Sequence, residues 1–234
     1  MSATEKSLLV FDTPAYSANE VACILNLPSA TVKAWFFGYN YQSGQKRFQP
    51  VIVPADPKRR LLSFANLCEL HVLSAIRRRH KVSLFKVRES IEYLRSQLGS
   101  STHPLIDNQL HTNNIDLFVE HASKLLNISR HGQEAMRGDF EQALARIERD
   151  NNGSPVRLFP FSRTSISAVD QPKSVVIDPR VSFGRPVLAS VAIPTEIIAD
   201  RFLAGDSPTE MAKDYRVDEK EIEEAIRFEQ RRAA

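Results

Sequence analysis

The sequence has no apolar run near the roughly 20 residues that a membrane-spanning helix needs. Its first residues, MSATEKSLLVFDTP, also lack the basic stretch and long apolar region of a secretion signal. We therefore expect a cytoplasmic protein with no membrane partner. The two cysteines, Cys23 and Cys68, lie far apart in helix-like patterns, so neither a disulfide framework nor a cysteine-pair metal site is predicted. We expect both to be buried thiols.

Motifs of the common enzyme classes are also missing. The sequence contains no Gly-rich phosphate loop and no nucleophile elbow. Four histidines follow one another at intervals of eight or ten residues, without the i, i+2 or i, i+4 spacing that places two imidazoles on one metal. These are His103, His111, His121 and His131. We therefore expect neither catalysis nor a bound metal or cofactor.

What the chain does contain is an ordinary globular composition with an uneven distribution of charge. Of its 234 residues, 42% are hydrophobic and 25% are charged, which is enough to bury a core. Residues 1–98 hold 14 Lys and Arg against 7 Asp and Glu, whereas residues 99–234 hold 17 against 21. A basic N-terminal part with an acidic remainder is typical of a nucleic-acid-binding module joined to a protein-binding module, although ordinary proteins also show it.

Two short helices are predicted near the N-terminus. Ser17 and Glu20 have the spacing of a capping box, which marks the start of the first helix. Ser29 can cap a second helix over residues 30–37, which Gly38 ends. Two helices joined by a tight turn are the layout of a helix-turn-helix, whose second helix enters the major groove of DNA. The side chains expected to face the bases are Ala30, Thr31 and Lys33.

A basic two-stranded wing is predicted after these helices. Residues 46–53 and 59–62 are β-rich and flank a turn at residues 54–57. Long cations on such a ribbon can bind phosphates, while a merely solvated basic hairpin is the alternative. The cations are Lys46, Arg47, Lys58, Arg59 and Arg60.

Two longer helices complete the N-terminal unit. The first covers residues 64–80 and ends in a basic run, which the helix dipole favours whatever the function. The second starts at Ser83 and has an apolar stripe that packs in the core or against a second subunit. The stripe consists of Leu84, Val87, Ile91, Leu94 and Leu98.

The rest of the chain predicts two further units. Between residues 99 and 165 we expect a small α+β unit, with a helix over residues 136–149. Its extended segments are expected at residues 105–113, 115–119, 124–128 and 156–159. A Ser-, Thr- and Pro-rich linker follows at residues 160–173.

The last unit repeats the helix-turn-helix pattern with opposite charge. Strands are expected at residues 175–177 and 187–189. Three helices follow: the first covers residues 196–204, the second starts at the capping box of Ser207 and Glu210, and the third starts at Asp218. Phosphates would repel the acidic last helix, so we expect it to bind protein. Its acidic residues are Glu219, Glu221, Glu223, Glu224 and Glu229.

The predicted fold is therefore α+β and mainly α, in three units. These are a winged helix-turn-helix at residues 1–98, a small α+β unit at 99–165 and a three-helix, helix-turn-helix-like unit at 166–234.

Two segments resemble known families. The run YSANEVACILNLPSATVKAW and residues 59–87 resemble the winged helix-turn-helix of MerR-like regulators, with Lys33 where that family usually has arginine. Lysine keeps the positive charge but lacks the planar fork of a guanidinium. The resemblance implies DNA binding by the second helix. Together with the predicted wing, the expected DNA-binding residues are Ser29, Thr31, Lys33, Trp35, Lys46, Arg47, Lys58, Arg59 and Arg60.

Residues 175–230 closely resemble the bacterial domain of unknown function numbered 433, found in antitoxins. They depart from it at Ser190-Val191-Ala192, where the domain often has Gly-Thr-Arg. Both segments together resemble the longer VapB-type antitoxins. The resemblance implies an antitoxin, usually dimeric, that binds operator DNA, represses its own operon and neutralises a PIN-type ribonuclease toxin.

The C-terminal arginines are the predicted toxin-binding residues. If the partner is a nuclease that holds Mg²⁺ with carboxylates, an arginine can pair with these carboxylates and exclude the ion. The candidates are Arg227, Arg231 and Arg232. The alternative function is a MerR-like transcription regulator that senses a small molecule, which needs a ligand pocket and no protein partner.

Overall fold

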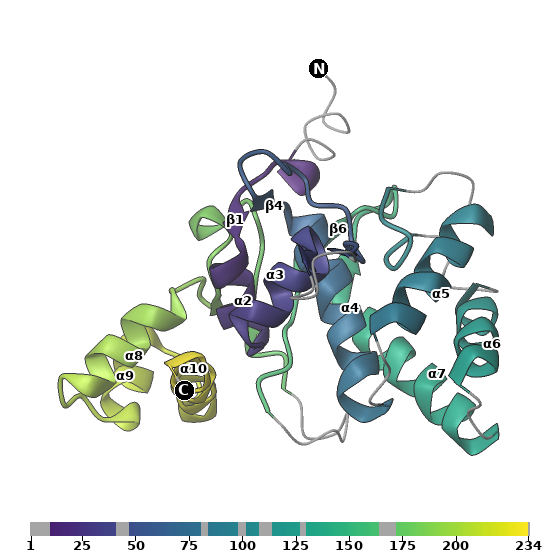
Figure 1. The fold of residues 1–234 in the computed structure, drawn as a ribbon. Helices are drawn as coiled ribbons and strands as arrows, with labels where there is room; N and C mark the ends of the chain where they lie inside the picture. The colour runs from purple at the N-terminus through teal and green to yellow at the C-terminus, as the bar shows by residue number, and fades with distance from the viewer. Residues whose placement is uncertain are drawn as a thin grey trace.

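The computed structural model describes residues 10–40, 47–80, 84–97, 102–107, 114–126, 130–163 and 172–233 (Figure 1). Helices dominate these residues, and the described strands form short two-stranded antiparallel sheets. This confirms the predicted fold class. Within the described ranges, no helix has the length and apolarity needed to cross a bilayer.

The predicted helix-turn-helix is present. Strand β1 (Tyr16–Ser17) leads into α2 (Ala18–Leu25), and α3 (Ser29–Phe37) follows after a short turn. The capping box forms as expected, since the Ser17 amide donates to the Glu20 carboxylate at 2.7 Å and the Glu20 amide donates to Ser17 Oγ at 3.2 Å. The turn requires Asn26 in the left-handed region, at φ 51°.

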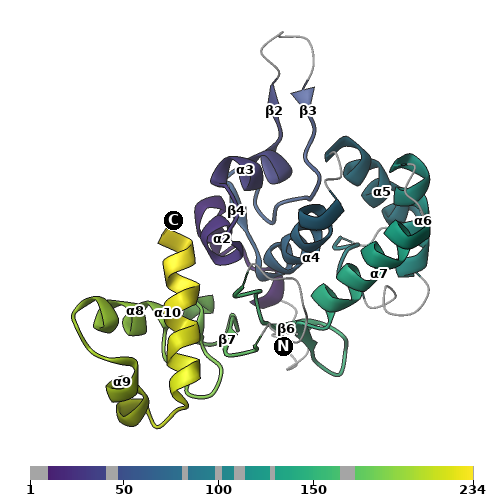
Figure 2. The same ribbon diagram turned by 90° about the horizontal axis from the view of Figure 1, so that it is seen from below.

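The predicted wing is wrong in its pairing. Strand β2 (Tyr39–Asn40) pairs with β3 (Arg47–Phe48), and the hairpin extends beyond the end of α3 (Figure 2). Strand β4 (Leu61–Leu62) pairs instead with β1. The reason is that residues 51 and 52 turn inward, where their buried side chains join the core and both amides donate to the carbonyl of Trp35.

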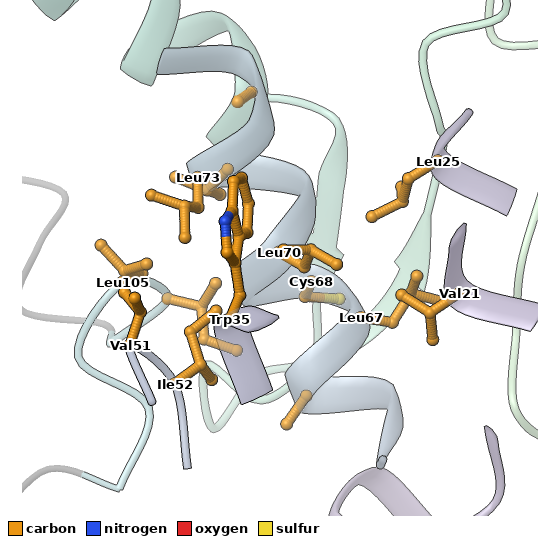
Figure 3. Close-up of a cluster of buried hydrophobic side chains, with 14 of the residues drawn as sticks. Val21, Leu25, Trp35, Val51, Ile52, Leu67, Cys68, Leu70, Leu73 and Leu105 are labelled. Atoms are coloured by element: carbon orange, nitrogen blue, oxygen red, sulfur yellow. The ribbon is translucent and has the colours of Figure 1, made fainter. Parts of the chain in front are cut away.

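Four long helices build the body of the molecule. These are α4 (Phe64–His80), α5 (Leu84–Gln97), α6 (Asn114–Leu126) and α7 (Arg130–Leu144). Helix α4 packs against α7, and α5 packs against α6 (Figure 2). One hydrophobic cluster runs from Phe11 to Ile177, with Trp35 close to α4 (Figure 3). The predicted unit boundary at residue 98 stays a prediction, although this cluster extends across it.

The extended segments predicted at residues 115–119 and 124–128 are wrong, because α6 covers residues 114–126. Its buried side chains Ile115, Phe118, Val119 and Ala122 follow the i, i+3, i+4, i+7 spacing of a helix. Residues 105–107 of the first expected segment are not in a strand, and residues 108–113 and 127–128 lie outside the described ranges.

The predicted helix over residues 136–149 is confirmed only in part. Helix α7 begins earlier and ends at Leu144, and β5 (Ile147–Arg149) follows, paired with β6 (Pro155–Leu158).

The apolar stripe of α5 lies inside the chain. Val87, Ile91 and Leu94 are all at most 2% exposed and belong to the main cluster. The expectation that this stripe contacts a second subunit is therefore wrong for these three residues, and the alternative of core packing is confirmed.

The C-terminal unit has a hydrophobic cluster of its own. Strands β7 (Val175–Val176) and β8 (Val187–Leu188) pair, and the short 3-10 helix η3 (Ser182–Gly184) lies between them. Three helices follow as predicted, α8 (Thr195–Leu203), α9 (Pro208–Tyr215) and α10 (Glu219–Ala233). The cluster includes Leu188, Ile198, Met211 and Ile222. Of the expected linker, residues 164–171 lie outside the described ranges.

The two cysteines differ in exposure. Cys68 is fully buried in α4, and burial raises the pKa of its thiol. Cys23 is only half-buried, so the expectation of a buried thiol is confirmed for Cys68 and not for Cys23.

Candidate nucleic-acid interface

Helix α3 has one face in the core and one face toward solvent. Val32, Trp35 and Phe36 are at most 1% exposed. Lys33 is exposed and Thr31 is half-buried on the other side. The predicted DNA contact of Trp35 is therefore wrong, because its indole packs among core side chains (Figure 3).

Ser29 connects the two helices of the motif. Its hydroxyl donates to Asn19 Oδ1 of α2 at 2.5 Å. The N-cap of α3 is Pro28, so Ser29 lies within the first turn and is not the cap that the sequence predicted. This hydrogen bond ties the start of the recognition helix to α2.

The cations of residues 58–60 lie on a closed turn. Asp56 and Leu61 exchange two backbone hydrogen bonds at 3.0 Å, and Asp56 Oδ1 accepts from the Arg59 amide at 2.9 Å. All three cations of the turn are exposed. The guanidinium of Arg60 lies over the ring of Phe37, 4.3 Å from its centroid, which places the turn against the end of α3.

A hollow of about 370 Å³ joins these parts. It is lined by the first residues of α2, by Lys33 and Phe37 of α3, and by Arg60 of the turn. The dipole at the N-terminus of α2 attracts anions, and the cations Lys33 and Arg60 add to that field, although the amides of Ser17 and Glu20 are used by the capping box. The arrangement is suited to a phosphate of a nucleic-acid backbone.

The other predicted wing residues are only partly described. Arg47 is in β3, at the base of the hairpin, and its side chain is outside the described part, as is all of Lys46.

The predicted toxin-binding arginines lie on α10. Arg231 Nη1 donates to the carbonyl of Phe161 at 2.5 Å, so its insertion into a partner would require this bond to break. Arg227 pairs with Glu224 of the same helix. Arg232 lies in the last turn of the helix, and its side chain is outside the described part.

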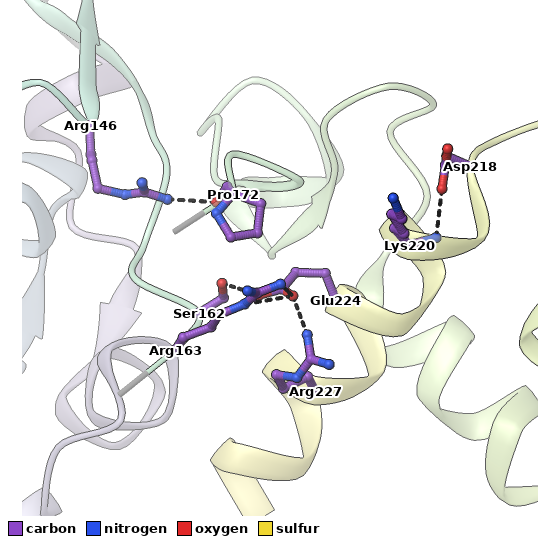
Figure 4. Close-up of polar contacts among 8 residues, drawn as sticks. All are labelled: Arg146, Ser162, Arg163, Pro172, Asp218, Lys220, Glu224 and Arg227. Atoms are coloured by element: carbon purple, nitrogen blue, oxygen red, sulfur yellow. Dashed lines mark hydrogen bonds and ion pairs between the residues drawn. The ribbon is translucent and has the colours of Figure 1, made fainter. Parts of the chain in front are cut away.

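A buried carboxylate holds α10 to the preceding segment (Figure 4). Glu224 is 1% exposed and pairs with Arg163 Nη2 at 2.9 Å, and it accepts a hydrogen bond from Ser162. Burial raises its pKa, but the hydrogen bonds from Arg163 and Ser162 outweigh this, so the pKa of Glu224 lies below its ordinary value.

A second polar cluster, partly buried, was missed from the sequence. The ring nitrogens of His103 lie 2.9 Å from Glu69 Oε2 and 2.9 Å from Asp12 Oδ1. Burial lowers the pKa of His103, but the hydrogen bonds to Asp12 and Glu69 raise it to about 9. These residues are 34 and 91 positions apart from His103, so no local pattern reveals the cluster. Among the described residues, no group of three or more His, Cys, Asp or Glu is arranged to hold a metal.

Helices α9 and α10 form a second unit of the same kind. The capping box of Ser207 and Glu210 forms as predicted, and Arg216 ends α9 in the left-handed region, at φ 58°. The exposed surface of α10 carries both acidic and basic side chains, among them Glu219, Lys220, Glu223 and Arg227, so the uniformly acidic helix expected from the sequence is not found.

Comparisons with known proteins match both ends of the chain. Residues 14–91 match the family described as "Putative DNA-binding HTH domain", and residues 175–228 match "Protein of unknown function (DUF433)". The helix-turn-helix of α2 and α3 lies within the first match, and the resemblances to a DNA-binding helix-turn-helix domain and to the domain of unknown function are confirmed.

Relatives cover nearly the full length. The chain is 26% identical over 247 residues to "Putative antitoxin VapB45" of Mycobacterium tuberculosis, covering 97% of this chain and 98% of the relative. It is 25% identical over 227 residues to "Uncharacterized protein Rv2308" of the same organism, covering 94% and 91%. The crystal structure of Rv2018 from M. tuberculosis has a TM-score of 0.65 at 20% identity, covering 93% of this chain and 100% of that one, which shows the fold.

Proposed function

We propose that the chain is an antitoxin that binds operator DNA as a homodimer and represses its own operon. The observation that carries the DNA-binding part is the continuous surface formed by the start of α2, Lys33 of α3 and the turn of residues 58–60. In this proposal Lys33, which is exposed, and Thr31, which is half-buried, contact bases or nearby phosphates. The exposed cations of the turn are placed to bind phosphates, which gives affinity with little sequence preference.

The second part of the proposal is that the C-terminal unit, residues 166–234, neutralises a PIN-type ribonuclease. Support comes from the relative named as an antitoxin and from the match of this segment to a different family than the DNA-binding part. Helix α10 carries the anion Glu223 at the exposed position that Lys33 has in α3, and phosphates repel an anion there. Arg227 and Arg232 remain candidate toxin contacts, whereas Arg231 first has to leave the carbonyl of Phe161.

Co-expression with a PIN-type ribonuclease from the same genome tests this part. The full chain, a chain ending at Gln230 and a chain ending at Phe161 are each co-purified with the ribonuclease, and RNA cleavage is measured. We expect the full chain to inhibit and the chain ending at Phe161 to fail. Full inhibition by the chain ending at Gln230 would remove Arg231 and Arg232 from the mechanism.

The same assays separate the antitoxin from a small-molecule sensor. A sensor binds DNA but neither co-purifies with a nuclease nor stops RNA cleavage. Loss of inhibition on truncation is informative only if the chain ending at Phe161 keeps the helical circular-dichroism spectrum and the operator affinity of the N-terminal unit.

A further inference from the structure

The turn of residues 180–185 presents an aromatic side chain to solvent. Phe183 is 95% exposed, more than any other large apolar side chain among the described residues. Ser182 and Phe183 have φ values of 48° and 56°, a left-handed conformation that is strained for residues other than glycine. Such a turn persists only where the surrounding structure holds it in place.

Two sets of contacts hold this turn. Asp178 is 3% exposed and accepts hydrogen bonds from the amide and from Nε of Arg180, both at 2.9 Å. The Tyr16 hydroxyl donates to the carbonyl of Gly184 at 3.2 Å. A Cβ at Gly184 would lie 2.0 Å from the Tyr16 hydroxyl oxygen, so only glycine fits this approach. Phe183 is therefore held rigidly beside β1 and α2.

A cavity of about 350 Å³ lies next to Phe183. Its walls come from β1 and α2, from the turn itself, from the start of α8 and from α10. Three carboxylates line it, from Glu20, Glu196 and Glu229, against the single cation Arg185. The turn carries two cations that are more than half exposed, Arg180 and Arg185, which pair within the chain with Asp178 at 2.8 Å and with Glu196 at 3.6 Å.

We propose that Phe183 of one chain inserts into this cavity of a second copy, and that the second copy does the same in return. A two-fold interface pairs one surface patch with itself. Here the patch contains both the projecting aromatic ring with its cations and the acidic cavity that receives them. Phenylalanine and arginine are also among the residue types enriched at protein–protein interfaces.

The other apolar faces considered for dimerisation are already covered. Val87, Ile91 and Leu94 are buried in the main cluster, and Ile222, Ala225 and Phe228 of α10 are buried within the C-terminal unit. The inference rests on the proposed function only for the expectation that a two-fold symmetric operator requires two copies. Because Tyr16 precedes the N-cap of α2, this contact would also set the spacing of the two DNA-binding helices.

The first test measures the oligomeric state of the full chain by sedimentation velocity between 1 and about 100 μM, a range chosen to bracket micromolar dimers. Phe183→Ser removes the ring, and Leu203→Ser is the matched control, because Leu203 is 80% exposed near the end of α8. We expect a wild-type dimer whose dissociation constant rises at least tenfold in Phe183→Ser and is unchanged in Leu203→Ser. A monomeric wild type, an unaffected Phe183→Ser dimer, or an equal loss in both variants would overturn the proposal.

The second test locates the contact. Benzoylphenylalanine replaces Phe183, and an equal mixture of ¹⁵N-labelled and unlabelled chains is irradiated and analysed by mass spectrometry. We expect crosslinks between copies to residues that line the cavity. Crosslinks confined to one copy, or formed only with a co-purified nuclease, would contradict it. Binding to an operator half-site is measured in parallel. If the wild-type chain dimerises through Phe183 but does not bind DNA, the proposed function is refuted and this inference stands.

Discussion

The two helix-turn-helix units have the same backbone pattern and differ in charge at an exposed position of their second helix. Ser17 and Glu20 form a capping box, and so do Ser207 and Glu210, 190 positions later. Asn26 and its counterpart Arg216 both end the first helix in the left-handed region. In both units the next amide donates to the carbonyl of an alanine five residues earlier, at 2.9 Å and 3.1 Å.

The equivalent side chains divide by exposure. The buried positions are apolar in both units, with Val21 and Val32 matched by Met211 and Ile222, all 0% exposed. At the exposed position, Lys33 is matched by Glu223. Buried residues therefore determine the shape of the unit, and exposed residues determine its partner. A helix-turn-helix backbone is by itself no evidence of DNA binding.

The largest expected effect comes from giving position 33 of α3 the charge that Glu223 has in α10. Lys33→Glu replaces a cation facing the phosphates with an anion, and we expect operator affinity to fall by about 10- to 100-fold, as for the loss of a strong contact. Fluorescence anisotropy at fixed salt measures this. The matched control, Glu223→Lys, changes the equivalent residue of α10 and should alter affinity by less than about threefold. A large gain in Glu223→Lys would mean that α10 also lies against DNA.

The second prediction concerns Glu224, whose counterpart in α3 is Ala34. Glu224→Ala removes the carboxylate that joins Ser162 and Arg163 to α10, and we expect about 2 kcal/mol lower stability in urea unfolding at pH 7. Both arginine partners are partly exposed, which limits the loss. The pKa of Glu224 lies below its ordinary value. The stabilisation by the ionised carboxylate is therefore complete at pH values above the ordinary pKa of glutamate, and it is lost as the pH falls through the lower pKa that Glu224 has in the folded protein. An unchanged unfolding midpoint would show that this carboxylate does not hold α10.

The third prediction is a pH dependence within the N-terminal body. The pKa of His103 is raised from 6.5 to about 9. The contribution of the charged imidazole to the free energy of unfolding is therefore complete below pH 6.5 and disappears as the pH rises through 9. We expect the free energy of unfolding to fall by about 1 to 3 kcal/mol between these values. Histidine-to-glutamine substitution at this position should flatten the profile. A wild-type profile that is flat over this range would refute the charged bridge to Asp12 and Glu69.

The smallest effect is expected from the turn of residues 58–60. Arg59→Ala removes one exposed cation, which should weaken binding about equally for all DNA sequences and reduce the magnitude of the salt slope by about 1. Titrations at several salt concentrations, on operator and unrelated DNA, measure both quantities. A change in sequence preference would contradict a phosphate contact.

Features that depend on neighbouring residues were predictable from the sequence. Both capping boxes need only residues three positions apart, and they predicted the starts of α2 and α9 correctly. Helix α6 was missed although its apolar residues have helical spacing, because short β-rich runs were given more weight. The order of the strands could not be found locally, since β4 pairs with β1 rather than with the nearer β3.

The errors and omissions among the predicted site residues have the same physical origin. Trp35 was assigned to DNA because it lies on the recognition helix, and only the packed core shows that it faces inward. The bond from Arg231 to Phe161 joins residues 70 positions apart, and the His103 bridge to Asp12 spans 91. Contacts at such separations depend on the complete fold and leave no motif.

Hydrogen exchange of the full chain with and without operator DNA tests the central comparison most directly, because both units are observed in one molecule. Backbone amides that contact phosphates or lie beneath bound DNA exchange more slowly. The account predicts added protection at the start of α2, in α3 and in residues 56–61, with none in α9 or the exposed turns of α10. Protection concentrated in α9 and α10, with α3 unchanged, would contradict it.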